Sequence, residues 1–204
     1  MVDVKVAVLA SGHGTNLQAL LDDPVIRPWI ALVVSDRESA VALARAEAHG
    51  VPTAIVQRRA FADRAAFDHA VLEALQDAGI GFVVLAGYLL LVGPEIVQAF
   101  AGRIVNVHPA LLPAFPGTTS VADALAWGVK VTGVTVHLVD EELDHGPVVF
   151  QEALAVHDDD DWDALEARVH EVEHRLLPAA VRALVEGRLE IHERRVRVLE
   201  PVDD

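Results

Sequence analysis

The chain has 204 residues, 52% of them hydrophobic, and one sizeable domain is the expected organisation. Its formal net charge of −15 excludes a broad surface for nucleic acid or anionic membranes, and the lack of cysteine excludes disulfides, thiol nucleophiles and thiolate metal sites. No apolar run is long enough to span a bilayer and the N-terminus shows no signal-peptide pattern, so we expect a cytoplasmic protein.

Strands and helices alternate over residues 1–100. Strands are predicted at 4–10, 30–34, 53–56 and 81–86, and helices from 17 onward and at 39–49, 59–78 and 94–100. The helix at 59–78 is expected to bury Phe61, Ala65, Ala66, Val71, Leu72 and Leu75. This order predicts an α/β fold with a doubly wound, mostly parallel Rossmann-like sheet and helices on both faces.

The remaining residues depart from this alternation. We predict a fifth strand at 103–107, a helix at 121–127, and two strands at 131–139 and 148–156. The last two could pair as an antiparallel edge of the sheet in the C-terminal half. An acidic run at 158–163 is expected to cap a long helix at 162–186, and 189–199 to form one or two short strands.

A glycine turn joins the first strand to the first helix, an arrangement that directs free N–H groups at an anion. Gly12-x-Gly14, with Asp36 about twenty residues further on, resembles a dinucleotide-binding motif, but Leu17 replaces the third glycine. A single terminal phosphate fits better, held by N–H groups near Gly14 and Thr15, the Thr15 hydroxyl and the Asn16 amide. The alternative is a tight turn and helix cap that binds nothing.

Asn106 and His108 lie at the end of the fifth strand, just before a proline-rich loop. Residues two apart on a strand face the same side, and ligands of open α/β sheets bind beyond the carboxyl ends of the strands. An amide donor beside a titratable ring suits a reaction in which a carbonyl oxygen becomes negative. The alternative is a buried, hydrogen-bonded pair without a catalytic role.

Asp144 lies in a loop between two predicted strands, directly before His145-Gly-Pro147, and a turn there can aim its carboxylate. A carboxylate near His108 would keep the ring charged or orient it, but the sequence does not show that Asp144 approaches His108. His137, inside an apolar strand, is expected to be a structural histidine.

Metal and covalent chemistry are not predicted. His170 and His174 are four apart on a helix, with Glu171 and Glu173 nearby, but we interpret them as a polar helix face and expect no metal. No serine or cysteine occupies a nucleophile elbow, which argues against a covalent acyl-enzyme.

Taken together, these motifs resemble the phosphoribosylglycinamide formyltransferase family, over nearly the whole chain from Val4 to about Leu189. The matching stretches are 10–18 (ASGHGTNLQ), 84–88 (VLAGY), 106–113 (NVHPALLP), 115–117 (FPG), 131–139 and 143–147 (LDHGP). Methionyl-tRNA formyltransferases would carry an added C-terminal domain and a basic surface, and formyltetrahydrofolate deformylases an extra N-terminal domain. We expect neither here.

The resemblance implies transfer of the formyl group of 10-formyltetrahydrofolate to the amine of phosphoribosylglycinamide, a reaction of purine synthesis. It implies that Asn106 donates to the developing oxyanion, that His108 stabilises it and relays a proton, and that Asp144 raises the proton affinity of His108. Its partners would be these small molecules, with no metal, nucleic acid or membrane, and the protein would be a monomer or homodimer.

The resemblance also assigns binding residues. Gly14, Thr15 and Asn16 would hold the substrate phosphate, and Glu173 would face the substrate amine. The folate would contact Arg64, Asn106 and the segment Leu89, Leu90, Leu91 and Val92. A single domain, 1–204, would thus have a phosphate-binding half (1–100) and a catalytic and folate half (101–204).

Two departures bear on affinity: Leu89-Leu90 stand where the family usually has Met-Arg, and Thr119 stands where bacterial relatives often have histidine. They keep open a formyltransferase that acts on a different amine. A non-catalytic nucleotide- or folate-binding protein is a further alternative. A third alternative, an NAD-dependent oxidoreductase, is suggested by the glycine turn together with Asp36.

Overall fold

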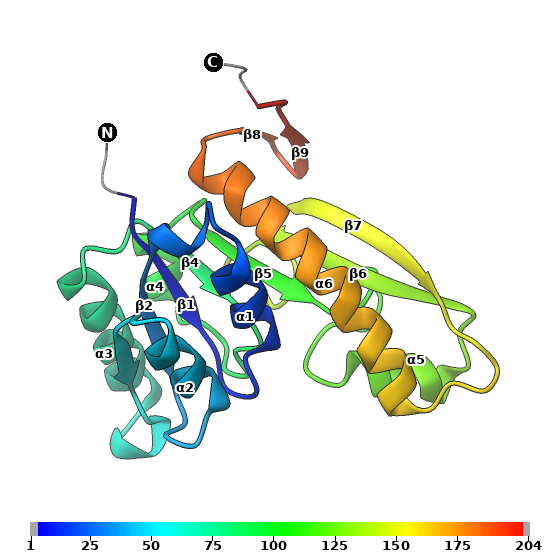
Figure 1. Cartoon of the computed structure of the whole chain (residues 1–204), viewed down its shortest axis with the longest axis horizontal. Helices are drawn as coiled ribbons and strands as arrows, with labels where there is room; N and C mark the ends of the chain where they lie inside the picture. Colours follow the sequence, from blue (N-terminus) through cyan, green and yellow to red (C-terminus); the bar gives the residue numbers. More distant parts are fainter. Residues whose placement is uncertain (1–3, 202–204) are drawn as a thin grey trace. The chain divides into compact units, whose positions relative to one another are not determined.

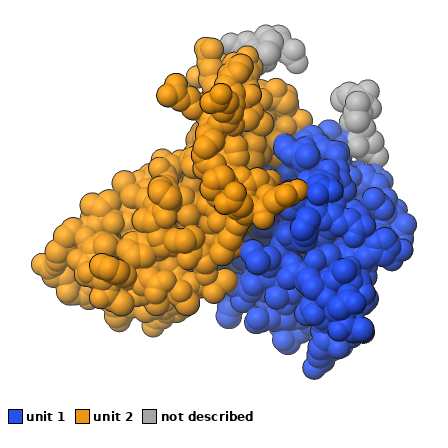
Figure 2. All heavy atoms as spheres, turned by 180° about the vertical axis from the view of Figure 1, so that it is seen from behind, with its two compact units in different colours: residues 1–105 blue, residues 106–204 orange. Residues whose placement is uncertain are grey.

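The computed structural model describes residues 4–201, and the chain divides into two compact units, residues 1–105 and 106–204 (Figure 2). The first unit contains four parallel strands in the order β3-β2-β1-β4. They are β1 (Val6–Leu9), β2 (Ile30–Ser35), β3 (Thr53–Ile55) and β4 (Phe82–Leu85). All four residues of β1 are buried, as expected for a central parallel strand covered on both faces.

The helices of this unit are α1 (Thr15–Asp22), α2 (Val41–Ala48), α3 (Arg64–Asp77) and α4 (Pro94–Ala99), with 3₁₀ turns η1 (Arg27–Trp29) and η2 (Arg58–Ala60). The chain steps from β1 through β2 to β3 in one direction, and then returns to place β4 on the other side of β1. Right-handed crossovers therefore put α1 and α2 on one face and α3 on the other. Accordingly α1 packs on α2, and α3 packs on α4 (Figure 1).

The prediction of a single helix at 59–78 is wrong for its first residues. The chain forms η2, and α3 starts only at Arg64, because the Asp63 carboxylate caps it by accepting a hydrogen bond from the Ala66 N–H at 2.8 Å. The position of this helix start determines which face of α3 packs against the core. Val71, Leu72 and Leu75 are buried as predicted, but Ala65 and Ala66 are exposed, Phe61 is half-buried, and Phe67 and Asp68 are buried in their place.

The strand β5 (Ile104–His108) enters the second unit at Asn106. It is followed by α5 (Ser120–Trp127), β6 (Val131–Leu138), β7 (Val148–Ala155), α6 (Trp162–Val185), β8 (Leu189–His192) and β9 (Arg195–Val198). Figure 1 shows α6 lying along β6 and β7, on which it packs. The Asp161 carboxylate caps α6 through the Ala164 N–H at 2.8 Å, as the acidic run predicted.

The antiparallel pairing of β6 with β7 is confirmed, and β8 and β9 form a hairpin whose second strand pairs parallel with β7 at Val148. The predicted α/β class, a mostly parallel sheet flanked by helices with an antiparallel C-terminal edge, is thus confirmed. Within residues 4–201, no helix combines the length and the apolar character needed to cross a membrane.

Candidate active site

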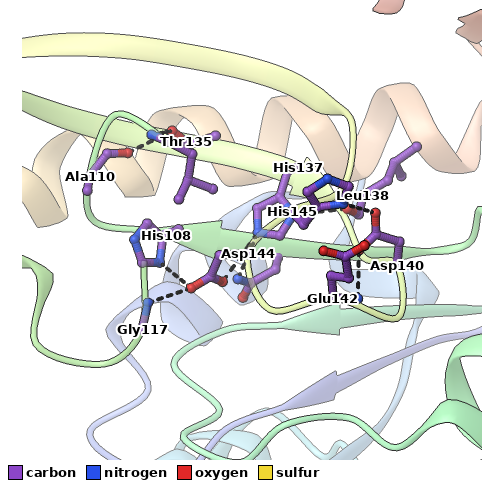
Figure 3. A network of polar contacts seen from close by, with 12 residues as sticks. His108, Ala110, Gly117, Thr135, His137, Leu138, Asp140, Glu142, Asp144 and His145 are labelled. Atoms are coloured by element: carbon purple, nitrogen blue, oxygen red, sulfur yellow. Dashed lines mark hydrogen bonds and ion pairs between the residues drawn. The ribbon is translucent and has the colours of Figure 1, made fainter. Parts of the chain in front are cut away.

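The end of β5 delivers Asn106 and His108 to a cluster that also contains His137 and Asp144 (Figure 3). His108 is only 3% exposed, whereas Asn106 is half-buried. The strand ends at His108 because Pro109 lacks the N–H that would continue the ladder. Both side chains therefore project from the carboxyl-terminal end of a buried strand, as the two-residue spacing predicts.

The hydrogen bonds of His108 define which ring nitrogen can exchange a proton. Its Nε2 lies 2.8 Å from the Phe115 carbonyl oxygen and 3.1 Å from Ser120 Oγ. Because a carbonyl only accepts, Nε2 carries a hydrogen and donates it to Phe115. Its Nδ1 lies 3.5 Å from Asp144 Oδ2. The second proton of the ring is therefore gained or lost at Nδ1, on the side of the carboxylate.

Two opposing effects act on the pKa of His108. Burial lowers it, Asp144 and the Phe115 carbonyl raise it, and His137 lowers it, so that the pKa lies below its ordinary value of 6.5. The ring is therefore neutral at neutral pH. Asp144 does favour the charged ring, as the sequence suggested, but burial is the larger effect.

Asp144 is held by its backbone and by its carboxylate. Its φ is +50°, and Oδ2 accepts a hydrogen bond from the Gly117 N–H at 2.7 Å while Oδ1 lies 3.7 Å from His137 Nε2. Its side chain is 7% exposed. Burial raises the pKa of Asp144, but the contacts with His137, the Gly117 N–H and His108 together lower it below its ordinary value. The carboxylate is therefore charged and faces His108, an approach that the sequence left open.

His137 orients the Asn106 amide. The ring Nδ1 lies 2.9 Å from the Leu138 carbonyl oxygen and therefore donates to it, and the ring Nε2 lies 3.1 Å from Asn106 Nδ2. The ring of His137 thus fixes the orientation of the Asn106 amide. The sequence predicted a structural histidine here. The structure agrees that it is buried and hydrogen-bonded, but its partners are two of the candidate catalytic residues.

The loop that supplies Phe115 and Gly117 is anchored by Thr135. The Thr135 hydroxyl donates to the Ala110 carbonyl at 2.7 Å and accepts from the Leu112 N–H at 3.1 Å. Gln151 Nε2 donates both to this hydroxyl and to the Leu112 carbonyl. The proline-rich loop is thus fixed to β6 and β7, and its carbonyl and N–H groups reach His108 and Asp144 in a defined geometry.

The glycine turn of the first unit forms the N-terminus of α1. Gly14 is the N-cap with φ +71°, and a Cβ on it would lie 2.7 Å from Ala42 Cβ and 2.8 Å from Ala42 Cα, so only glycine fits. Thr15 and Asn16 are the first helical residues. Arg45 Nε donates to the His13 carbonyl at 2.9 Å and braces the turn from α2. The turn therefore holds the N-terminal end of α1, which carries partial positive charge, in a fixed position.

Arg64 contacts the segment 89–92 of the same unit. Its Nε lies 2.7 Å and 2.8 Å from the two carboxylate oxygens of buried Asp68, and its Nη2 donates to the Leu91 carbonyl. The Leu89 N–H donates to Ser11 Oγ at 2.9 Å. Leu89 and Leu91 are exposed, and Leu90 and Val92 are half-buried. Arg64 thus shapes the backbone of this segment through contacts within the protein.

Residues 4–181 of the chain match the formyl transferase family. The chain belongs to this family. It is 39% identical over 184 residues to the phosphoribosylglycinamide formyltransferase of Bacillus subtilis, covering 89% of this chain and 94% of that protein. It is 47% identical over 183 residues to the protein of the same name from Mycobacterium tuberculosis H37Rv, covering 88% and 84%. The crystal structure of glycinamide ribonucleotide transformylase 1 from Symbiobacterium toebii has a TM-score of 0.94 at 44% identity, covering 98% of this chain and 96% of that one.

In this formyl transferase Glu173 lies on α6 with a side chain that is 6% exposed, and its carboxylate is 3.9 Å from His170 Nε2. The His170 and His174 rings are stacked, with their centroids 5.9 Å apart. Within the described part of the chain, no three His, Cys, Asp or Glu residues are grouped so that they could hold a metal ion. On the helix face that was predicted to be polar, the carboxylate of Glu173 is therefore buried.

Three contributors to this site of the formyl transferase were missed from the sequence: the ring of His137, the hydroxyl of Ser120 and the carbonyl of Phe115. The available signal for His137 was that a histidine lies within an otherwise apolar strand. Ser120 and Phe115 carried no signal, because their role depends on where the proline-rich loop turns.

Proposed function

We propose that this formyl transferase transfers the formyl group of 10-formyltetrahydrofolate to the amine of 5′-phosphoribosylglycinamide, giving formylglycinamide ribonucleotide and tetrahydrofolate in purine synthesis. The observation that carries the proposal is the cluster in which an oriented amide, Asn106, adjoins a buried His108–Asp144 pair. The names of the relatives supply the formyl acceptor.

The amine attacks the formyl carbon and the formyl oxygen becomes negative. The Asn106 amide that His137 orients is suited to donate to this oxyanion. One proton must pass from the attacking amine to the departing folate nitrogen. We assign this relay to His108 Nδ1, because Nε2 is engaged by the Phe115 carbonyl. The charged Asp144 stabilises the imidazolium that forms in passing.

Further residues are proposed to bind the substrates. The N–H groups at Gly14, Thr15 and Asn16 would hold the phosphate, since the start of a helix carries partial positive charge. The buried carboxylate of Glu173 would attract the substrate amine. Arg64, Asn106 and the backbone of Leu89, Leu90, Leu91 and Val92 would contact the folate. With leucine at position 90, the anionic folate tail lacks an arginine partner there.

A direct assay tests the proposal: phosphoribosylglycinamide and 10-formyltetrahydrofolate are mixed with the protein and tetrahydrofolate release is followed. Release that needs the ribonucleotide supports it. Release only with another amine from a substrate panel would favour the alternative formyl acceptor. Binding of either molecule without release would indicate a non-catalytic binding protein, and binding of NAD would revive the oxidoreductase alternative. The monomeric or homodimeric state and the cytoplasmic location stay predictions.

A further inference from the structure

The C-terminal hairpin β8–β9 lies beyond the part of the chain that matches the family, which ends at residue 181. Its turn is Glu193-Arg194, between the paired residues His192 and Arg195. Arg195 also pairs with Val148, the first residue of β7. The hairpin turn therefore lies beside the base of the loop that joins β6 to β7 and carries Asp144.

Arg194 contacts that loop at the residue next to Asp144. Its Nη1 lies 2.9 Å from His145 Nε2 and 3.3 Å from His145 Nδ1, and its Nη2 donates to the His145 carbonyl oxygen. The other ring nitrogen, Nδ1, lies 2.8 Å from Asp140 Oδ2 (Figure 3). The guanidinium of Arg194 and the carboxylate of Asp140 thus both contact the ring of His145. One guanidinium thus ties both the backbone and the side chain of His145.

The backbone beside His145 needs such support. Asp144 has φ +50°, a conformation that a residue with a side chain keeps only where its surroundings impose it. On its far side, a Cβ on Gly146 would lie 1.7 Å from the Leu138 carbonyl oxygen, so the loop is already in close contact with β6 there. Between Asp144 and Gly146, His145 is the residue that Arg194 holds.

We propose that Arg194 is a positioning residue that keeps the Asp144 carboxylate against His108 by fixing His145. The inference rests on the proposed function, because it concerns the proton relay of that site. His145 is 45% and Asp140 36% exposed at their side chains, so solvent screens these contacts. Loss of Arg194 then lowers the fraction of molecules with Asp144 in place without abolishing it.

The kinetic test compares Arg194→Ala with Arg195→Ala, an equally exposed arginine of the same hairpin. We expect Arg194→Ala to lower kcat about threefold to tenfold while both KM values change less than about twofold, since solvent-screened pairs contribute little each. Arg195→Ala is expected to leave kcat within about twofold. Arg194→Lys should fall between, because one ammonium cannot reach the carbonyl and the ring with the geometry of a guanidinium.

A second readout separates positioning from mere stability. Asp144 raises the pKa of His108, against burial and His137, which lower it. In Arg194→Ala, an NMR titration of the His108 ring is therefore expected to show a pKa below that of the wild type and of Arg195→Ala. A lower unfolding temperature with an unmoved His108 titration would overturn the inference, and so would kcat equal to that of Arg195→Ala. If the wild type releases no tetrahydrofolate, the proposed function fails, yet the titration still decides the role of Arg194.

Discussion

Replacing Gly14 by alanine tests the turn that is proposed to hold the substrate phosphate. At φ +71° a residue with a Cβ pays roughly 1–2 kcal/mol for its conformation alone. Its methyl group would also lie 2.7 Å from Ala42 Cβ and 2.8 Å from Ala42 Cα. The second atom belongs to the backbone of α2, so it cannot rotate away, and such overpacking costs about 1–3 kcal/mol. Together the two effects amount to about 2–5 kcal/mol.

Part of this cost is expected to appear as lost substrate affinity. The strain is relieved when the turn moves away from α2, which misplaces the N–H groups at the start of α1. We expect the KM for phosphoribosylglycinamide to rise about tenfold or more, because about 1.4 kcal/mol of lost binding is a factor of ten. The KM for the folate should change less than about twofold. Steady-state kinetics with each substrate varied in turn, together with thermal unfolding, measure both parts.

Gly12→Ala is the matched control in the same turn. No atom lies within 4 Å of a Cβ on Gly12, and its φ is not in the left-handed region, so we expect near wild-type kinetics and stability. A Gly14→Ala protein with the unfolding temperature and KM of Gly12→Ala would refute the steric argument. Lower stability with an unchanged KM would refute the assignment of the phosphate to this turn.

Three other predictions concern the second unit. Asn106→Ala should lower kcat about a hundredfold, as loss of an oxyanion donor does elsewhere, and unchanged tetrahydrofolate release would count against the mechanism. Because Asp144 raises the pKa of His108, Asp144→Asn should move the low-pH limb of the kcat profile to lower pH, and a profile of unchanged shape would contradict the pairing. Burial lowers the pKa of His108 and of His174 below 6.5, so the stability that their neutral rings contribute is present above pH 6.5 and is lost as the pH falls towards their folded-state pKa values. The unfolding temperature should therefore drop as the pH falls below about 6.5, and His174→Gln should reduce that drop.

The sequence predicted the elements well where local signals and tertiary packing agree. The parallel strands of the first unit are continuous apolar runs bounded by turns, and the pairing of β6 with β7 followed from their alternation. The start of α3 was misplaced because apolar spacing was followed through Asp63. A capping carboxylate was present in the sequence and, given more weight than the periodicity, would have placed the helix start correctly.

Within the candidate site, the strand period was enough to bring Asn106 and His108 together, since it fixes which side chains share a face. It could not bring Asp144 to the ring. That approach depends on a positive φ at Asp144 and on the close contact of Gly146 with the Leu138 carbonyl, and neither has a local sequence signal. Nor could it identify the proton-carrying nitrogen of His108, which the carbonyl of Phe115 decides from seven residues away.

The contacts of the Thr135 hydroxyl limit which substitutions this protein can accept near the site. A hydroxyl offers one donor and two acceptor positions, and the Ala110 carbonyl, the Leu112 N–H and Gln151 occupy all three. A side chain without that oxygen would deprive the Ala110 carbonyl and the Leu112 N–H of this partner, whereas Gln151 would keep its bond to the Leu112 carbonyl, so substitution at position 135 is expected to loosen the loop. Downstream of this anchor, the Phe115 carbonyl, the Gly117 N–H and the Ser120 hydroxyl still contact His108 and Asp144. The Thr119 side chain instead donates to Asp123. Variation of the Thr119 side chain can therefore alter contacts in this loop without removing the groups that hold His108 and Asp144.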